Sequence, residues 1–194
     1  MSTRLNFLVY LFLFSATGLF ANDRDGLPIV PKPQQGTIAE TYITFDNEWE
    51  VYIDPEAKEA SDYVTSVLKE CGVQARFTAR KNSADLILDI QQKISKNREA
   101  YHLSVYKNRK IRVLAVSRNG LLYALQSLRQ IISRSGNGIT LPVCRIMDEP
   151  AFPWRAFMLD ESRHFQGMET VKKLLDEMSY LKMNIFHWHL VDDP

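Results

Sequence analysis

Two groups of polar side chains stand out for the chemistry that they could do. The first group follows an apolar run that ends at Leu159, and the second lies in and after the apolar run that begins at Asn184. The members are Asp160, Ser162, Arg163 and His164 in the first group, and His187, His189, Asp192 and Asp193 in the second. Guanidinium and carboxylate groups form paired hydrogen bonds with adjacent hydroxyls, so carbohydrate is the natural candidate for a ligand.

The two histidines of the second group allow an alternative. His187 and His189 would share one face of a strand, where both could bind a metal ion, as in a metal-dependent amidohydrolase. The pair belongs to the second strand and not to the first, and two aspartates follow it. We therefore favour the interpretation that the two histidines pack in the core or support neighbouring groups, rather than bind a metal ion. Asp160 and His164 could act in the site or brace the strand ends. Trp188 lies on the opposite face and is expected in the core.

A strand, a loop, a helix and a second strand are predicted to position these groups. The expected ranges are a strand at 155–159, a loop at 160–166, a helix at 168–182 and a strand at 184–191. The helix is predicted because its apolar residues recur at three- and four-residue spacing. In a parallel β-α-β unit both strands end at one edge, which is where α/β barrels and open sheets carry their active sites. Both polar groups should therefore face one pocket.

Residues 38–150 are expected to form a separate α+β domain. Apolar patterning predicts strands at 41–45 and 49–53, paired through a turn at Asp46-Asn47, and further strands at 84–90, 101–105 and 111–116. Helices are predicted at 56–71, with Gly72 as the C-terminal glycine, and from residue 119 or 120 to 132. Residues 22–37 carry three prolines and are expected to be a linker without core residues.

The N-terminus has the pattern of a secretory signal peptide, which we assign to residues 1–21. Arg4 precedes an apolar run at 7–14, and small residues follow as far as Ala21. A helix that spans a membrane needs about 20 largely apolar residues, which is more than this run provides, so no stable membrane span is expected. The sequence therefore predicts a secreted or periplasmic protein.

The composition is that of an ordinary globular chain. Of 194 residues, 45% are hydrophobic, and 24 Lys+Arg against 23 Asp+Glu leave a net charge of +1. Proteins that bind phosphate backbones normally carry a clustered basic excess, so nucleic acid is a poor candidate for a partner. An oxidising compartment would allow a disulfide between Cys71 and Cys144. The sequence does not show that the two approach each other, and two free thiols are the favoured alternative.

Four segments carry a specific pattern. They are RNGLLYALQSLRQ at 118–130, DEPAFPWR at 148–155, MLDESRHF at 158–165 and KMNIFHWHLVDDP at 182–194. The last three resemble the opening of the catalytic barrel of family 20 β-N-acetylhexosaminidases. The first is similar to the helix that closes the non-catalytic α+β domain before that barrel. The resemblance implies an α+β N-terminal domain followed, at 151–194, by the start (β-α-β) of a truncated (β/α)8 TIM-barrel catalytic domain.

The resemblance also implies an activity, which is the exo-hydrolysis of terminal β-linked N-acetylglucosamine or N-acetylgalactosamine. The 2-acetamido oxygen of the substrate serves as the nucleophile, and no cofactor or metal is needed. By position, Arg163 would bind hydroxyls of the terminal sugar, and Asp192 would support the acid residue indirectly. His189, Asp160 and His164 are further candidates. The implied partners are N-acetylhexosamine-terminated glycans or chito-oligosaccharides.

The catalytic Asp-Glu pair of that family is expected outside these 194 residues. The chain alone is therefore predicted to be inactive as a glycosidase. Asp193 could take the role that we give to its neighbour Asp192. Two residues depart from the family pattern: Ala156 replaces a frequent glycine, and Glu161 stands where a small or β-branched residue is usual. Glu161 could alter the loop that presents Arg163. A secreted, non-catalytic carbohydrate-binding protein is the alternative of a different class.

Overall fold

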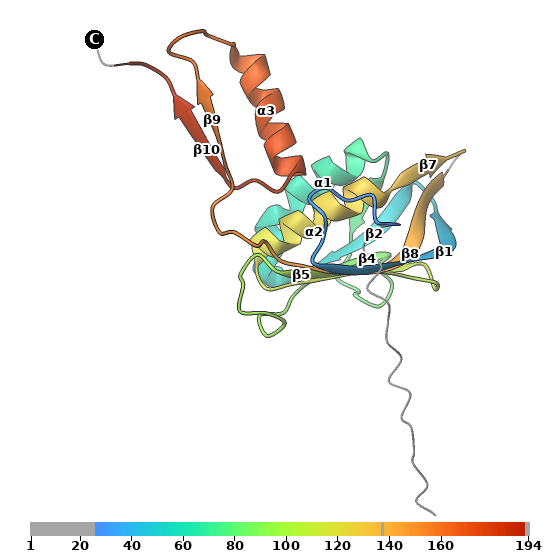
Figure 1. Ribbon diagram of the computed structural model, residues 1–194. Coiled ribbons are helices and arrows are strands. Elements are labelled where there is room, and N and C mark those ends of the chain that lie inside the picture. Colours follow the sequence, from blue (N-terminus) through green and yellow to red (C-terminus); the bar gives the residue numbers. More distant parts are fainter. Residues whose placement is uncertain (1–25, 137, 193–194) are drawn as a thin grey trace, which may run out of the picture.

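The structure, a computed structural model, describes residues 26–136 and 138–192. The signal peptide predicted at 1–21 lies outside these residues, and so does Asp193. One large β-sheet with helices forms the first part of the chain, and a β-α-β unit follows (Figure 1). The strands of the large sheet are β1 (Gln35–Phe45), β2 (Glu48–Ile53), β3 (Gln74–Phe77), β4 (Leu86–Ile90), β5 (Tyr101–Tyr106), β6 (Lys110–Ala115), β7 (Ser133–Ser135) and β8 (Gly138–Asp148).

The large sheet is part antiparallel and part parallel. Its strand order is β1-β8-β5-β6-β4-β2-β3, with β7 beside β8. The pairs from β1 to β6 are antiparallel, and the pairs from β6 to β3 are parallel. Parallel neighbours need a crossover, which α1 (Ser61–Glu70) provides between β2 and β3. This mixed sheet with its helices confirms the predicted α+β fold of the N-terminal domain.

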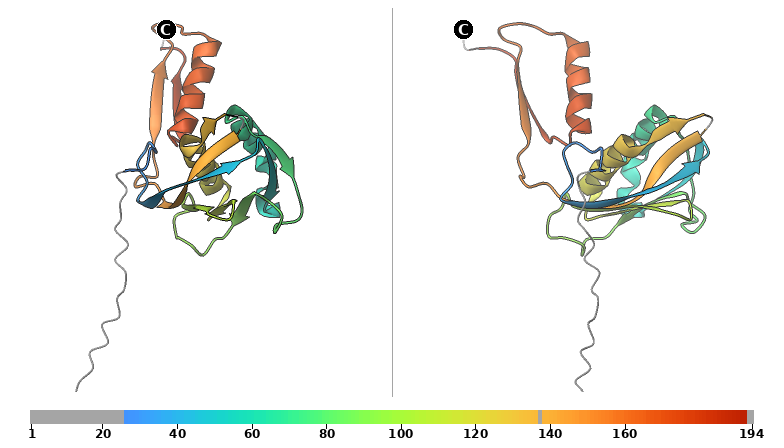
Figure 2. Two further views of the ribbon diagram at one scale, coloured as in Figure 1. Left: turned by 90° about the vertical axis from the view of Figure 1, so that its right-hand side faces the viewer. Right: turned by 45° about the vertical axis from the view of Figure 1, so that its right-hand side comes forward.

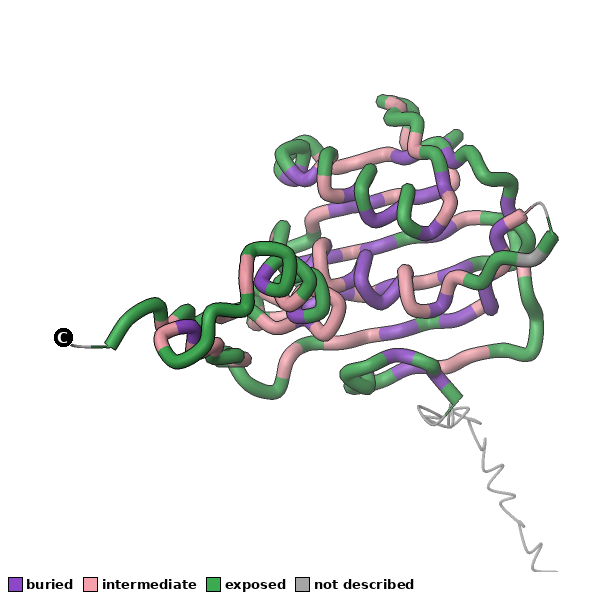
Figure 3. The backbone as a smooth tube through the Cα atoms, turned by 90° about the horizontal axis from the view of Figure 1, so that it is seen from above, coloured by how far each residue is buried: buried purple, intermediate pink, exposed green. Residues whose placement is uncertain are grey.

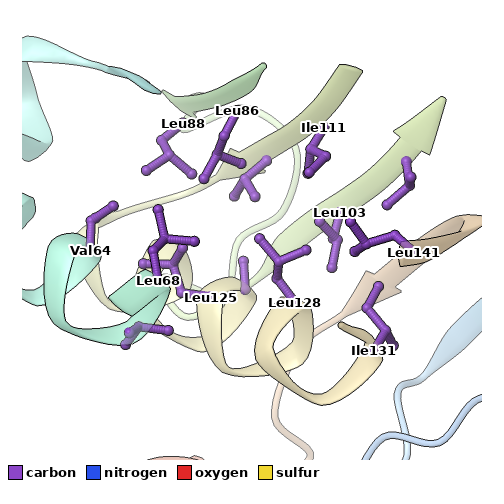
Figure 4. Packing of buried hydrophobic residues seen from close by; sticks show 14 of the residues in the cluster. Val64, Leu68, Leu86, Leu88, Leu103, Ile111, Leu125, Leu128, Ile131 and Leu141 are labelled. Carbon is purple, nitrogen blue, oxygen red and sulfur yellow. The ribbon is translucent and has the colours of Figure 1, made fainter. Parts of the chain in front are cut away.

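Helices α1 and α2 (Arg118–Ile131) cover one face of the large sheet (Figure 1). Along the central strands buried residues alternate with more exposed ones, as the tube in Figure 3 shows. Figure 4 shows the contact between helices and sheet, which is made by Val64, Leu68, Leu86, Leu88, Leu103, Ile111, Leu125, Leu128, Ile131 and Leu141. Burying each such side chain contributes roughly 1.5–3 kcal/mol, so this layer supplies the core of the domain.

Both helices predicted for this domain are present. The first one, predicted at 56–71, starts as a 3₁₀ helix (Pro55–Ala60) one residue earlier than predicted. The Asp54 carboxylate accepts a hydrogen bond from the Glu56 N–H at 2.9 Å at this start. Gly72 follows α1 with φ +83°, a conformation that suits glycine at a helix end. Ser117 precedes α2, and its hydroxyl accepts a hydrogen bond from the N–H two residues further on.

The predicted pairing of residues 41–45 with residues 49–53 is wrong. Both segments are strands, but β1 pairs with β8, whereas β2 pairs with β3 and β4. Instead of closing a hairpin, the carbonyl of Asn47 accepts a hydrogen bond from Gln74 N–H at 2.7 Å. The Asp46 carbonyl accepts another from the indole of Trp49 at 2.9 Å. The backbone groups of the supposed turn are therefore used by other partners.

The expectation that residues 22–37 contribute nothing to the core is also wrong. Leu27 and Ile29 are buried, at 6% and 3% exposure. Leu27 packs over Gly36, where any side chain would overlap it. The side-chain amide of Gln130 fixes this segment by accepting a hydrogen bond from Val30 N–H at 2.6 Å and donating one to the Val30 carbonyl at 3.0 Å. Residues 26–37 thus form part of the N-terminal domain.

Strands β3, β7 and β8 are absent from the sequence prediction, and β8 is a central strand. Pro142 interrupts β8 and removes one backbone donor, which makes the segment unlike a central strand in sequence. Pro142 stands opposite Tyr42 of β1, at the point where the register between the two strands shifts after Ile38. The irregular pairing of β1 there accommodates the missing N–H.

The predicted β-α-β unit is confirmed. It consists of β9 (Ala156–Asp160), α3 (Met168–Tyr180) and β10 (Ile185–His189), and the two strands are parallel. The unit projects from the large sheet (Figure 2). Two strands and one helix leave much of the small sheet uncovered. Trp188 is 46% exposed in the described part of the chain. The expectation that it lies in the core is therefore wrong.

Both cysteines are free and buried, as the favoured alternative predicts. Burial raises the pKa of the Cys71 thiol to about 11, although the charge of Arg129 lowers it in part. Burial also raises the pKa of the Cys144 thiol to about 12, although a backbone hydrogen bond from Val105 lowers it in part. The two thiols therefore act as small core residues.

Polar networks connect the β-α-β unit to the N-terminal domain, among them those of Lys182 and Arg155. The ammonium of Lys182, which is 8% exposed, donates to the Tyr101 hydroxyl at 2.9 Å and to the Asp148 carboxylate at 3.2 Å. The guanidinium of Arg155 donates to both carboxylate oxygens of Glu99, at 3.0 and 3.2 Å. Burial lowers the pKa of Lys182, and the Asp148 charge opposes that change.

Candidate functional site

The carboxyl ends of β9 and β10 lie side by side, as the sequence predicts. Asp160, the last residue of β9, is paired in register with His189, the last residue of β10. Both strands run away from the large sheet, so this edge is the end of the unit farthest from that sheet (Figure 1). The residues that follow the two strands come together here.

Four polar residues at this edge form a ring of contacts, which we call the polar ring: Asp160, Ser162, His189 and Asp192. The Ser162 hydroxyl oxygen lies 2.7 Å from Asp160 Oδ1 and 3.0 Å from Asp192 Oδ2. His189 Nδ1 lies 3.4 Å from Asp160 Oδ1, and Nε2 lies 3.2 Å from Asp192 Oδ1. A serine has one hydroxyl proton, so at any moment it donates to only one of the two carboxylates.

Asp160 organises the loop that follows β9. Its Oδ1 accepts hydrogen bonds from the backbone N–H groups of Ser162 at 3.1 Å and Arg163 at 3.4 Å. This side-chain turn is typical of aspartate at the start of a loop. The hydrogen bond from the Ser162 hydroxyl lowers the pKa of Asp160, and the two backbone donors and the charge of His189 lower it further. Partial burial raises this pKa but does not cancel the lowering. Asp160 is therefore a carboxylate at neutral pH.

Arg163 extends from this loop into solvent, with 83% of its side chain exposed. Of the described residues, only Asp160 forms an ion pair with it, at 3.4 Å between Nε and Oδ2. The rest of its planar fork of donors is available to a ligand with adjacent hydroxyls. The site is open: the side chain of Asp192 is 60% exposed as well. The edge is thus a surface with one arginine and two carboxylates rather than an enclosed pocket.

The structure does not bring His164 or His187 into the polar ring. The His164 side chain is exposed, and its backbone carbonyl accepts a hydrogen bond from the Gln166 amide at 3.4 Å. His187 is also exposed and faces the same side of β10 as His189. Within 26–136 and 138–192, no group of three or more His, Cys, Asp or Glu is arranged to hold a metal ion.

Ser162 is the residue that the prediction from sequence leaves without a role. It contacts both carboxylates of the polar ring. The signal for it is the Asp-x-Ser spacing directly after a strand, which favours a turn closed by the aspartate side chain. That turn directs the serine hydroxyl back to Asp160. The roles given to Arg163, Asp192 and the other candidates stay predictions.

The chain combines a mixed-sheet domain with a parallel β-α-β unit. In α/β enzymes the active site lies at the carboxyl ends of the parallel strands, which is where this unit carries its polar residues. Two family models match the chain. "Glycosyl hydrolase family 20, domain 2" matches residues 26–149, and "Glycosyl hydrolase family 20, catalytic domain" matches residues 152–194. The chain belongs to glycosyl hydrolase family 20.

Relatives and solved structures agree with this membership. The chain is 30% identical over 180 residues to a β-hexosaminidase of Porphyromonas gingivalis, covering 87% of the chain and 23% of the relative. It matches the structure of a family 20 exo-β-N-acetylglucosaminidase from Vibrio harveyi, in complex with N-acetylglucosamine, with a TM-score of 0.76 and 30% identity over 86% of the chain and 26% of that structure. An N-acetyl-β-hexosaminidase of Streptomyces plicatus matches with a TM-score of 0.74 and 25% identity, over 86% of the chain and 35% of that structure. The chain therefore spans about a quarter to a third of the length of these proteins.

Proposed function

We propose that this chain is part of a β-N-acetylhexosaminidase, which removes terminal β-linked N-acetylglucosamine or N-acetylgalactosamine from glycans or chito-oligosaccharides. Membership of family 20 supports this activity. The observation that carries the proposal to this chain's own residues is the edge formed by Arg163 and the polar ring, where two strand ends meet.

In this proposal Arg163 binds hydroxyls of the terminal sugar. Its guanidinium stands clear of the protein surface, and Asp160 restrains it from one side only. Asp192 acts as a positioning residue for the group that protonates the leaving oxygen, and His189 and Ser162 hold Asp192 in place. Nothing in these roles calls for a cofactor or a metal.

The proposed reaction uses the substrate's own acetamido group. Its carbonyl oxygen forms a bond to the anomeric carbon while the glycosidic oxygen leaves with a proton from an acid residue, and water then opens the cyclic intermediate. We propose that β9, α3 and β10 are the first elements of the (β/α)8 barrel, and that the Asp-Glu pair of the reaction comes from another part of that barrel. The share of its relatives that the chain covers, 23% in the first case, supports this division.

We further propose that the protein is exported by the signal peptide at residues 1–21. The charged residue and the apolar run of that segment support the proposal. None of the helices in the described part of the chain is long and apolar enough to cross a membrane. Expression with and without residues 1–21, followed by cell fractionation, tests the proposal: export of both forms would contradict it.

Release of p-nitrophenol from p-nitrophenyl β-N-acetylglucosaminide tests the activity. The assay compares three proteins: these 194 residues, the product of the full open reading frame, and the same product with Arg163→Ala. We expect release only by the longer product, and a KM raised about tenfold or more by Arg163→Ala, because a lost arginine–hydroxyl contact weakens binding of the ground state and transition state alike.

The alternatives give different results. If no folded form releases p-nitrophenol but the chain binds chito-oligosaccharides, the non-catalytic carbohydrate-binding alternative replaces the hydrolase. Stoichiometric zinc in the longer product would support the His187 and His189 alternative of a metal-dependent amidohydrolase. Release of p-nitrophenol that persists in a chelator would rule that alternative out. Release by the 194 residues alone would show that our placement of the acid residue is wrong.

A further inference from the structure

Glu161 is buried although it lies in the exposed loop after β9. Its exposure is 6%, whereas Arg163 two residues later is almost fully exposed. The backbone N–H of Glu161 donates to the His189 carbonyl at 2.9 Å, which continues the pairing of β9 and β10 by one hydrogen bond. The side chain of Glu161 is thus fixed at its base by the small sheet.

The Glu161 carboxylate closes the loop that carries Arg163. Its Oε1 accepts a hydrogen bond from the backbone N–H of Gln166 at 3.0 Å, five residues further along the chain. At the other end of the loop, Asp160 accepts from the N–H groups of Ser162 and Arg163. Arg163 therefore lies in a short loop whose start is held by the Asp160 carboxylate and whose end is held by the Glu161 carboxylate.

The loop leads into α3 through Gly167, which has φ +84°. This left-handed conformation favours glycine, so the chain can turn sharply from the loop into the helix. Gln166 is the last residue before that turn. The hydrogen bond from Gln166 to Glu161 consequently ties the start of the helix to the end of β9.

The second oxygen of Glu161, Oε2, is buried and has no hydrogen-bond partner among the described residues. Leaving a buried polar atom unpaired costs free energy, and most such atoms in proteins are paired. An apolar side chain at this position would avoid that cost. The carboxylate is therefore present at a cost in stability, which points to a role for Glu161 beyond packing.

We propose that Glu161 is a positioning residue for Arg163: by closing the loop at residues 161–166 it fixes the arginine in the orientation that binds the sugar. The proposal rests on the proposed hexosaminidase activity and goes beyond it, because it assigns the affinity for the terminal sugar in part to a buried residue that never touches the substrate. The essential property of Glu161 is an acceptor oxygen that reaches Gln166, not its charge.

The test is a set of variants of the full open reading frame product, assayed on p-nitrophenyl β-N-acetylglucosaminide. Glu161→Ala should raise KM about tenfold, with kcat changed less than about twofold, because it removes binding that is equal in ground and transition states. Glu161→Gln keeps the acceptor oxygen at the same reach and should stay near the wild-type KM. Glu161→Asp keeps the charge but is too short, so it should behave like Glu161→Ala.

A double-mutant cycle with Arg163→Ala separates positioning from general structure. If Glu161 acts through Arg163, then adding Glu161→Ala to Arg163→Ala should change KM less than about twofold. Glu177→Ala is the matched control, because Glu177 is exposed on α3, eleven residues beyond Gln166, and should leave kinetics and melting temperature unchanged.

Two results would overturn the proposal. One is an equal effect of Glu161→Ala with and without Arg163, which would mean that the residue supports the fold only. The other is a normal KM in Glu161→Asp with a raised KM in Glu161→Gln, which would mean that charge matters rather than reach. A wild-type protein that is folded but inactive on this substrate would instead refute the proposed function. If Glu161→Ala does not fold, the comparison of the Gln and Asp variants decides.

Discussion

Lys182 provides the most direct test of how the two parts of the chain are joined. Its ammonium is buried between the Tyr101 hydroxyl and the Asp148 carboxylate, which is itself only 12% exposed. Lys182→Met keeps most of the length and volume of the side chain but removes the charge. Lys182 has φ +59°, and methionine would bear the same backbone strain, so the substitution removes the ion pair and the hydrogen bond to Tyr101 without changing that strain.

The expected cost follows from what Asp148 keeps. Removing one partner of a buried ion pair typically costs about 3–5 kcal/mol, since the other charge stays buried without compensation. Asp148 retains hydrogen bonds from Tyr101 at 2.8 Å and from Gln34 N–H at 3.0 Å, so we expect the lower end, about 3 kcal/mol. For a chain of this size that equals a fall in melting temperature of about 6–12 °C.

Thermal and urea unfolding, followed by circular dichroism, measure this cost. Lys172→Met is the matched control, because Lys172 lies on α3 with 59% exposure and should change stability by less than about 0.5 kcal/mol. The double variant Lys182→Met with Asp148→Asn removes both charges and should recover most of the loss. A loss below about 1 kcal/mol in Lys182→Met, or no recovery in the double variant, would refute the reasoning.

Other buried groups give further expected outcomes. Burial raises the pKa of Glu99, but the hydrogen bonds and charge of Arg155 lower it more, so the pKa of Glu99 is lower in the folded state than in the unfolded state. The stability that this gives is fully present above pH 4.5 and is lost as the pH falls through the pKa of the folded state. Glu99→Gln should therefore reduce the loss of unfolding free energy at acid pH, and an unchanged dependence on pH would contradict this reasoning. Gly120→Ala should cost about 1–3 kcal/mol in thermal melts, since its Cβ would overlap the Ala100 carbonyl; an unchanged melting temperature would count against this contact. With thiol pKa values of about 11 and 12, Cys71 and Cys144 should resist a thiol reagent at pH 8 until denaturant is added, and prompt labelling of the native chain would disprove their burial.

Local patterns account for the elements that could be predicted from the sequence. The apolar faces of α1, α2 and α3 recur at helical spacing, and the residues of β5 and β6 alternate between buried and more exposed positions. Each of these signals lies within one short segment. The parallel pairing of β9 with β10 follows in turn from the helix between them, because a strand-helix-strand sequence favours parallel neighbours.

The elements that were missed or mispaired depend on distant partners. The β8 strand contains Pro142, and only the register shift of β1 after Ile38 shows why a central strand tolerates it. The pattern of the two segments around Asp46-Asn47 predicts a hairpin, but β1 pairs with β8 and β2 pairs with β3 and β4. Leu27 and Ile29 reach the core from a proline-rich segment because Gln130, a hundred residues away from Val30, holds the backbone there. No local pattern contains that information.

The site shows the same division. The meeting of Asp160 with His189 could be predicted, because parallel strands end at one edge. The sharing of Ser162 between Asp160 and Asp192 could not, since it depends on the turn that follows β9. His164 was a candidate by sequence proximity, yet the loop turns its side chain into solvent.

The N-terminal domain determines where this edge lies. Arg155, just before β9, donates from its backbone N–H to the Asn184 side chain at 3.0 Å, and from its guanidinium to Glu99 of that domain. Asn184, just before β10, also donates to the Pro153 carbonyl at 2.8 Å. Both strands therefore start from residues linked to Glu99 of the N-terminal domain, and they are only five residues long, or about 17 Å at 3.3 Å per residue. The N-terminal domain contains none of the candidate site residues, yet it anchors the starts of β9 and β10 and so determines where the polar ring at their ends lies.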